Sequence, residues 1–255
     1  MGAENYTLGK GVIYFDRKNM TTGLYSGERD LGNAPAFSFN IAIEKLEHFS
    51  SRGGLKAKDK LIISQMTPSC TFTLDEITAE NFSLLSMAEI AEVSQVSGTA
   101  TNEAHTANHG NRFVLAKRMI SSVTVTNVAG TTTYVNGTDY LIDTTLKDDK
   151  IGRLYIPDGS TIPDGTVVHV DYSFAAYTYR EVRAFKETQV EGALRFVSDN
   201  PAGKQMEVAI WRVSLTPSGD TSMIGDDWST IGFSGEILKD EAGHPNSPYM
   251  SIIME

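Results

Sequence analysis

Phe37-Ser38-Phe39-Asn40-Ile41-Ala42-Ile43-Glu44 is the segment from which the fold class of this 255-residue chain is inferred. Its apolar residues alternate with small or polar ones, which is the period of a β-strand with one buried face and one wet face. Strands of this kind are typical of antiparallel sheets that cover a core with one side only. The stretch therefore predicts a half-buried antiparallel strand.

The same alternation returns along the rest of the chain. It is clear at residues 69–74 and at residues 167–174, where every second residue is apolar. Further predicted strands lie at 12–16, 61–65, 123–128, 140–143, 153–156, 193–197, 208–215 and 233–238. Turn-forming pairs such as Asn136-Gly137 and Asp158-Gly159 separate several of them. The sequence predicts a mainly β protein.

One segment has helical spacing instead. After Thr78, which is a suitable N-cap, Phe82, Leu84, Leu85 and Ala88 recur at helical positions. We expect one helix that runs to about Glu92 and packs an apolar stripe against the first sheet.

The character of the sequence changes after this helix. Residues 98–179 are rich in Thr and Val and carry closely spaced turns, which is typical of a small β-sandwich of the Ig-like kind. We expect this insert to interrupt a discontinuous core formed by residues 1–97 and 180–255.

Composition limits the classes of function. Hydrophobic residues make up 40% of the chain and charged residues 21%, which is typical of a folded globular protein. The formal net charge of −10 disfavours a nucleic-acid clamp, because phosphate binding needs clustered Lys and Arg. No apolar run approaches the roughly 20 residues that cross a bilayer, and no apolar segment follows a basic one at the start. We therefore expect neither a membrane anchor nor secretion.

Residues with catalytic or metal-binding chemistry are few. Cys70 is the only cysteine and belongs to an alternating run, so we expect a buried apolar residue rather than a nucleophile. His105 and His109 are four residues apart, but Thr106 stands where the zinc-protease pattern requires Glu. The segment around them resembles a linker more than a helix. We expect no metal site and no cofactor.

Two pairs of adjacent carboxylates leave a glycan hydrolase as an alternative. Such enzymes hold two carboxyl groups roughly 5 to 10 Å apart, and Asp148-Asp149 and Asp226-Asp227 are candidates. Adjacent acidic residues between strands are, however, usually solvated turns. Because the sequence also has no phosphate-binding loop and no nucleophile elbow, we expect a protein that is not an enzyme.

Several short segments of the sequence resemble those of a known protein family. Residues 194–204 are Leu-Arg-Phe-Val-Ser-Asp-Asn-Pro-Ala-Gly-Lys, and residues 211–219 are Trp-Arg-Val-Ser-Leu-Thr-Pro-Ser-Gly. Near the start stand Gly9-Lys10-Gly11-Val12-Ile13-Tyr14-Phe15, then Thr22-Gly23 and Leu31-Gly32-Asn33. Together they resemble the major tail tube proteins of long-tailed, non-contractile (siphovirus-type) phages. The resemblance covers about residues 9–92 and 180–238.

The resemblance implies a structural protein. Members of that family have a β-sandwich or barrel core with one helix and form hexameric rings, which stack into the hollow tube that conducts DNA to the host. The implied partners are other copies of the chain, a tape measure protein, and tail terminator and tip proteins, with viral DNA in transit but not specifically bound. The implied location is the virion, after assembly in the host cytoplasm. The insert would decorate the outside of the tube.

The resemblance also suggests roles for two sets of residues. The connection at 45–60 is long, polar and basic, and we expect a loop that reaches the neighbouring ring and meets an acidic surface there. Its candidate residues are Lys45, His48, Arg52, Gly53, Gly54, Lys56, Lys58 and Lys60. The candidate lumen-facing residues are Ser38, Asn40, Glu44, Ser69, Thr71 and Thr73. A lumen of negative sign would let the phosphate backbone slide.

A binding protein is the alternative to a tube subunit. A tail-tip component or a surface carbohydrate-binding β module would use exposed aromatic rings as a stacking platform. The candidate rings are Tyr134, Tyr155 and Tyr177.

Overall fold

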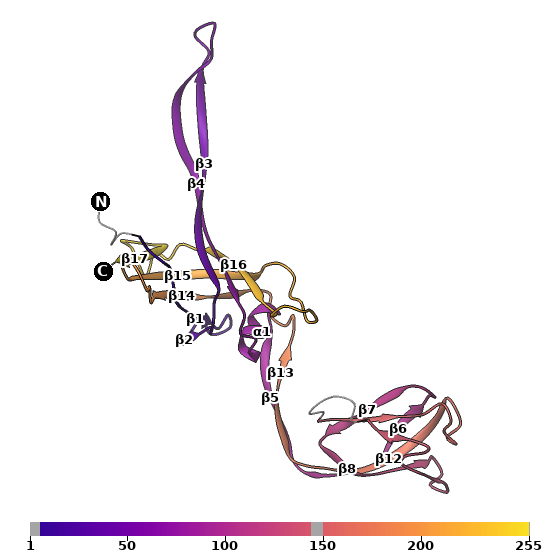
Figure 1. Ribbon diagram of the computed structural model, residues 1–255. Helices are drawn as coiled ribbons and strands as arrows, with labels where there is room; N and C mark the ends of the chain where they lie inside the picture. The colour runs from indigo at the N-terminus through magenta and orange to yellow at the C-terminus, as the bar shows by residue number, and fades with distance from the viewer. Residues whose placement is uncertain (1–5, 144–149, 255) are drawn as a thin grey trace. The chain divides into compact units, whose positions relative to one another are not determined.

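The structure is a computed structural model that describes residues 6–143 and 150–254 (Figure 1). These ranges contain seventeen strands and one helix, so the predicted mainly β class is confirmed. The chain divides into two compact units, of which the second is Glu92–Glu181 and the first comprises the chain on both sides of it. The sequence placed the insert at 98–179. β5 (Glu89–Gln95) and β13 (Tyr177–Arg183) pair with each other where the chain leaves the first unit and returns.

One eight-stranded sheet forms the first unit. Its order is β2-β1-β14-β15-β16-β4-β3, and β17 also pairs with β15. β16 and β17 share one edge of β15, since β16 pairs with residues 213–217 and β17 with residues 206–210. The strands are β1 (Gly11–Lys18), β2 (Tyr25–Asp30), β3 (Ala36–Ser50), β4 (Ala57–Leu74), β14 (Val190–Ser198), β15 (Met206–Pro217), β16 (Ile231–Ile237) and β17 (Met250–Met254).

Alternate residues of these strands build a single core. Phe72 and Phe233 are directly paired on β4 and β16, and their rings stack with centroids 5.0 Å apart. Phe37 on β3 stacks on Phe196 of β14 at 5.2 Å. Because β3 and β14 are not neighbours in the strand order, this stack shows that the sheet curls around its core. The largest fully buried side chains of this core are Phe15, Phe72, Phe233, Ile13, Leu31, Leu74, Leu194, Ile210 and Ile231.

The helix α1 (Ala79–Leu85) begins where the sequence predicts and ends earlier. The side chain of Thr78 caps it by accepting a hydrogen bond from the backbone N–H of Asn81. It packs on β15 and β16, but the prediction that it continues to about Glu92 is wrong. Met87 has a φ of 45°, and the following residues enter β5, because strand pairing outweighs their helical propensity. No helix of the described residues could cross a bilayer.

The second unit packs two small sheets on one core. One sheet has the order β6-β12-β8-β9 and the other β10-β11-β7. Buried residues from both sheets, such as Val168 of β12 and Leu154 of β11, belong to the same cluster. The strands are β6 (Gly98–Ala107), β7 (Arg112–Arg118), β8 (Ile120–Asn127), β9 (Thr133–Tyr134), β10 (Leu141–Ile142), β11 (Ile151–Tyr155) and β12 (Thr166–Phe174).

The interpretation of the segment around His105 as a linker is wrong. Residues 98–107 form β6, which pairs with β12 along its length. Its Thr residues suit a pleated, half-buried surface, and a partner strand supplies the hydrogen bonds that local sequence cannot reveal. His105 therefore lies in a strand and His109 in the turn beyond it, and the two do not share a helix face.

Candidate assembly surface on the β3–β4 arm

The longest strand pair of the chain extends past the sheet. β3 and β4 pair from Ala36 and Thr73 to Ser50 and Ala57. The next strand, β16, pairs with β4 only from Leu74 to Ser69. Beyond that point residues 41–68 form a two-stranded ladder, called the arm here, whose outer edges have no partner strand in the described residues. Figure 1 shows it leaving the sheet as a long projection.

The predicted long loop at 45–60 is mostly this ladder. Lys45 and His48 belong to β3, Lys58 and Lys60 to β4, and only residues 51–56 connect the strands. Polar contacts between the two strands support the pairing. Lys58 forms an ion pair with Glu47, and the His48 Nδ1 atom lies 2.5 Å from the Asp59 Oδ1 atom. The remaining candidates of the predicted loop, Arg52, Gly53, Gly54 and Lys56, lie in the connection.

One face of the arm is an apolar continuation of the core. The register sets Phe39 opposite Cys70, Ile41 opposite Pro68, and Ile43 opposite Met66, following the core pair Phe37 and Phe72. Directly opposite residues share a face, so the apolar surface runs without interruption from the core into solvent. Phe39, Ile41, Ile43 and Met66 are each 45–52% exposed.

The opposite face is polar and gathers all six candidate lumen-facing residues. The pairs are Ser38 with Thr71, Asn40 with Ser69, Glu44 with Gln65, and Thr73 with Ala36. The hydroxyl oxygens of Ser38 and Thr71 are 2.8 Å apart and share a hydrogen bond. The alternation in the sequence therefore correctly predicted that these six residues share one face of the ladder.

Two bulges change this pattern in the outer half of the arm. The register shifts between Glu44 and Lys45, where Ser64 is the extra residue of β4 and donates a hydrogen bond to the Glu44 carbonyl. Past this bulge Ile62 shares the formerly polar face with Leu46, while Ile63 and Leu61 stay on the apolar face. All four side chains are at least 45% exposed. The outer arm is therefore apolar on both faces, with no protein layer over either.

The arm is also basic in an acidic protein. Residues 45–60 contain five Lys or Arg and two acidic residues, a balance of +3, whereas the whole chain carries −10. The connection at 51–56 holds Arg52 and Lys56 and no carboxylate. A contact of the arm with the acidic remainder of another copy is electrostatically favourable.

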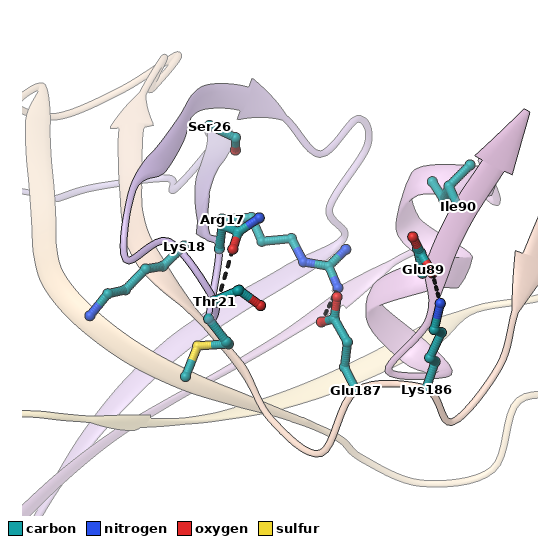
Figure 2. A pocket seen from close by; sticks show the side chains of 10 residues that line it. Arg17, Lys18, Thr21, Ser26, Glu89, Ile90, Lys186 and Glu187 are labelled. Atoms are coloured by element: carbon teal, nitrogen blue, oxygen red, sulfur yellow. Dashed lines mark hydrogen bonds and ion pairs between the residues drawn. The ribbon is translucent and has the colours of Figure 1, made fainter.

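A polar hollow of about 560 Å³ lies elsewhere in the first unit, between β1 and the segments around Glu89 and Lys186. Figure 2 shows two facing pairs of charged side chains, Arg17 with Glu187 and Lys186 with Glu89, whereas Lys18 points away from them. Arg17 contacts Glu187 at 2.5 Å and donates to the Ala88 carbonyl, and Lys186 is paired with Glu89. The contacts of Arg17 link β1 to the segment after α1 and to the segment before β14, and four of the charged groups of the hollow are paired within it.

The other predicted site residues do not come together. Cys70 is buried in the core, as expected, and burial raises the pKa of its thiol to about 11. The His105 Nε2 atom lies 2.7 Å from Glu103 and the His109 Nε2 atom 2.8 Å from the Ile162 carbonyl. The described residues contain no cluster of three or more metal-ligating side chains. Asp148-Asp149 lies outside the described residues, and Asp226-Asp227 is exposed in a loop.

The candidate aromatic platform is partly covered. The Arg112 guanidinium lies 4.7 Å from the centre of the Tyr155 ring, and the Lys150 ammonium lies 5.5 Å from that of Tyr177. The Tyr177 ring also stacks on Tyr179 at 5.8 Å. Neighbouring side chains therefore engage the Tyr155 and Tyr177 rings, and Tyr134 is partly buried against the core of the second unit.

Comparison with known proteins gives a family without an assigned activity. Residues 6–253 match the family described as protein of unknown function UCP028589. No curated protein matches the chain.

Proposed function

The chain belongs to this family of unknown function, and we propose that it is a structural subunit that polymerises as stacked hexameric rings into a hollow phage tail tube. Its working partners would be copies of itself, a tape measure protein, and the terminator and tip proteins at the tube ends. The proposal places it in the virion, where DNA passes through the tube without being bound.

The observation that carries the proposal is the bare arm. An isolated two-stranded ladder is at best marginally stable in water, and this one exposes apolar side chains along its length. Exposed apolar surface of this extent marks an interaction site. The arm therefore suits a chain whose native state includes neighbours that cover it.

Two free edges of the sheet support the same proposal. β2 and β3 stand at the ends of the strand order, and neither has a second partner strand in the described part of the chain. Free edges pair readily with other strands, and closure into a barrel removes them. If the β3 edge of one copy pairs with the β2 edge of the next, the contact is head to tail. Such a contact closes into a ring when the rotation from one copy to the next is a whole fraction of a full turn.

The polar face of β3 and β4 gives such a ring a suitable interior. Ser38, Asn40 and Thr71 offer hydroxyl and amide groups, and Glu44 adds negative charge. None of these side chains attracts phosphate as Lys or Arg would. In this arrangement the apolar face points to the protein layer, and the second unit lies outside the bore.

The test compares the wild-type chain with one that lacks the outer arm. Joining Glu44 to Gln65 through Asn-Gly removes residues 45–64 at a directly paired position and supplies a two-residue hairpin turn. We expect concentrated wild-type protein to sediment as polymers, and the shortened chain to remain monomeric with an unchanged melting temperature of its core. Equal sedimentation of both chains would contradict the role of the arm, and a wild-type chain that never polymerises would contradict the proposed function.

A further inference from the structure

The loop between β15 and β16 exposes large apolar side chains in an unusual way. Met223, Ile224 and Trp228 are 72%, 96% and 93% exposed. Hydrogen bonds inside the loop hold this shape, because Ser222 donates to the Ile224 carbonyl and Ser229 donates to the Ser222 carbonyl. The loop, residues 218–230, is called the Trp228 loop here. Tryptophan is the residue most often found at the energetic centre of an interface.

Acidic residues surround this apolar trio. Asp220, Asp226 and Asp227 are all exposed, and none forms an ion pair in the described residues. An apolar centre with a charged rim is the usual anatomy of a protein-binding surface. Its partner should carry an exposed apolar side chain between basic residues.

The end of the arm has that chemistry. Leu55 is 84% exposed and stands between Arg52 and Lys56 in the connection at 51–56. Arg52 and Lys56 form no ion pair with any residue that the structure describes. The two surfaces are complementary in sign and share an apolar centre, so they can cover each other.

The sheet register places these surfaces at opposite ends of the same strands. β16 starts at Ile231, directly opposite Leu74, which is the last residue of β4. The arm leaves from the other end, beyond Ser69, and the ten residue-to-residue steps from Asn40 to Ser50 extend it by about 33 Å. The two surfaces of one chain therefore cannot meet, whereas copies related head to tail along the strand direction bring them together.

We propose that the Trp228 loop is the docking site for the arm end of a second copy of this chain, with Leu55 against Trp228 and Ile224, and with Arg52 and Lys56 against Asp226 and Asp227. The inference rests on the proposed function and identifies the contact between successive rings. A contact of this kind does not close on itself, so it repeats along a filament.

A cysteine pair tests the contact directly. One chain carries Leu55→Cys, and a second chain with a different tag carries Ile224→Cys. In the control, the second chain carries Leu24→Cys instead, at a position in the same unit that is 70% exposed. The native Cys70 is buried and contributes little background. On mild oxidation of the mixture we expect about tenfold more disulfide-linked mixed dimer with Ile224→Cys than with the control, because docking holds the two cysteines together; a tenfold preference corresponds to about 1.4 kcal/mol of binding free energy. Equal yields would overturn the proposal.

Charge reversal and truncation give an independent measure. Arg52→Glu with Lys56→Glu, or Asp226→Lys with Asp227→Lys, should each slow association, and the combination should restore it. Trp228→Ser should weaken association about 30-fold, the loss typical of a hot-spot residue. If the combined charge reversal did not restore association, while Trp228→Ser still weakened it, the proposed pairing of Arg52 and Lys56 with Asp226 and Asp227 would be contradicted.

The two proposals fail in different ways. Tubes that form with no preferred Leu55–Ile224 cross-link would overturn the docking site and leave the tube function standing. A preferred cross-link in a protein that forms only short head-to-tail oligomers without a bore would support the docking site and overturn the tube.

Discussion

Replacing Ile43, Leu61 and Ile63 together with serine should leave the single chain folded and prevent its assembly. The three side chains lie on the apolar face of the arm, and each is 45–55% exposed. None lines a hollow that is shared with the core. Their replacement therefore removes surface that only a neighbouring copy would cover.

The magnitude follows from the exposed fractions. Full burial of a large aliphatic side chain contributes about 1.5–3 kcal/mol, and about half of each side chain remains for assembly to bury. The triple replacement should thus cost about 3 kcal/mol per subunit, which raises the concentration needed for assembly about 150-fold. Thermal melting of the core should change little, because the lost contacts lie within the arm.

The assay is the sedimented fraction as a function of protein concentration, with a melting curve of the same sample. Ala42→Ser with Thr67→Ser is the matched control, because these residues are directly paired on the opposite face. The control should assemble as the wild type does. An unchanged assembly threshold in the triple variant, or a melting temperature lowered as much as by a core substitution, would refute the reasoning.

Three further predictions concern the arm, the second unit and acid stability. Backbone amides of residues 41–68 should exchange with solvent rapidly in the single chain and slowly in the polymer, since a free ladder opens readily; slow exchange in the single chain would show that it is stable without neighbours. Removing residues 96–176 and joining Gln95 to Tyr177 through a glycine linker should leave the first unit folded, because both strands stay to pair with each other, and loss of its cooperative melting would contradict this. Hydrogen bonds from the backbone of Val135 and from Thr161 lower the pKa of Asp139 in the folded chain. The ionised carboxylate therefore stabilises the fold at pH values above the unfolded-state pKa, near 4. This stabilisation is lost as the pH falls through the lower pKa of the folded state. Asp139→Asn should therefore flatten the fall of the melting temperature between about pH 5 and pH 2, and an identical pH profile would contradict the assignment.

The core strands could be predicted because their period of two matches the burial that the structure shows. For residues 69–74 both the strand and its burial are confirmed, with Phe72 in the core and Thr71 on the opposite face. Residues 37–44 form the predicted strand, but the prediction that its apolar face is buried is wrong, because Phe39, Ile41 and Ile43 are 45–50% exposed where the strand leaves the sheet. The six candidate lumen residues were found together for the same reason. Local alternation identifies which residues share a face, but it does not reveal what covers that face.

The strand structure of residues 45–60 was not predicted, because bulges interrupt the period of the arm. Ser64 and Asp59 are extra residues of β4, so the alternate positions that face the apolar side change at each bulge, and a strict period of two assigns residues to the wrong face. The Lys residues and the glycine pair also suggested a loop, although Lys58 supports the ladder through its ion pair with Glu47, and His48 through its contact with Asp59. No period in the sequence could show that a hairpin extends beyond its sheet.

Other differences have tertiary causes. The residues after Leu85 have good helical propensity, but they pair as β5 with β13, which lies more than 80 positions later in the chain. β6 depends in the same way on β12. The Trp228 loop carries no motif, and only the exposure of its side chains distinguishes it from an ordinary acidic turn.

Electron cryo-microscopy of the concentrated protein tests the central proposal most directly. We expect hollow tubes of stacked six-fold rings, with Ser38, Asn40 and Thr71 lining the bore and each arm covered by neighbouring copies. Single particles at every concentration, or filaments without a bore, would contradict it.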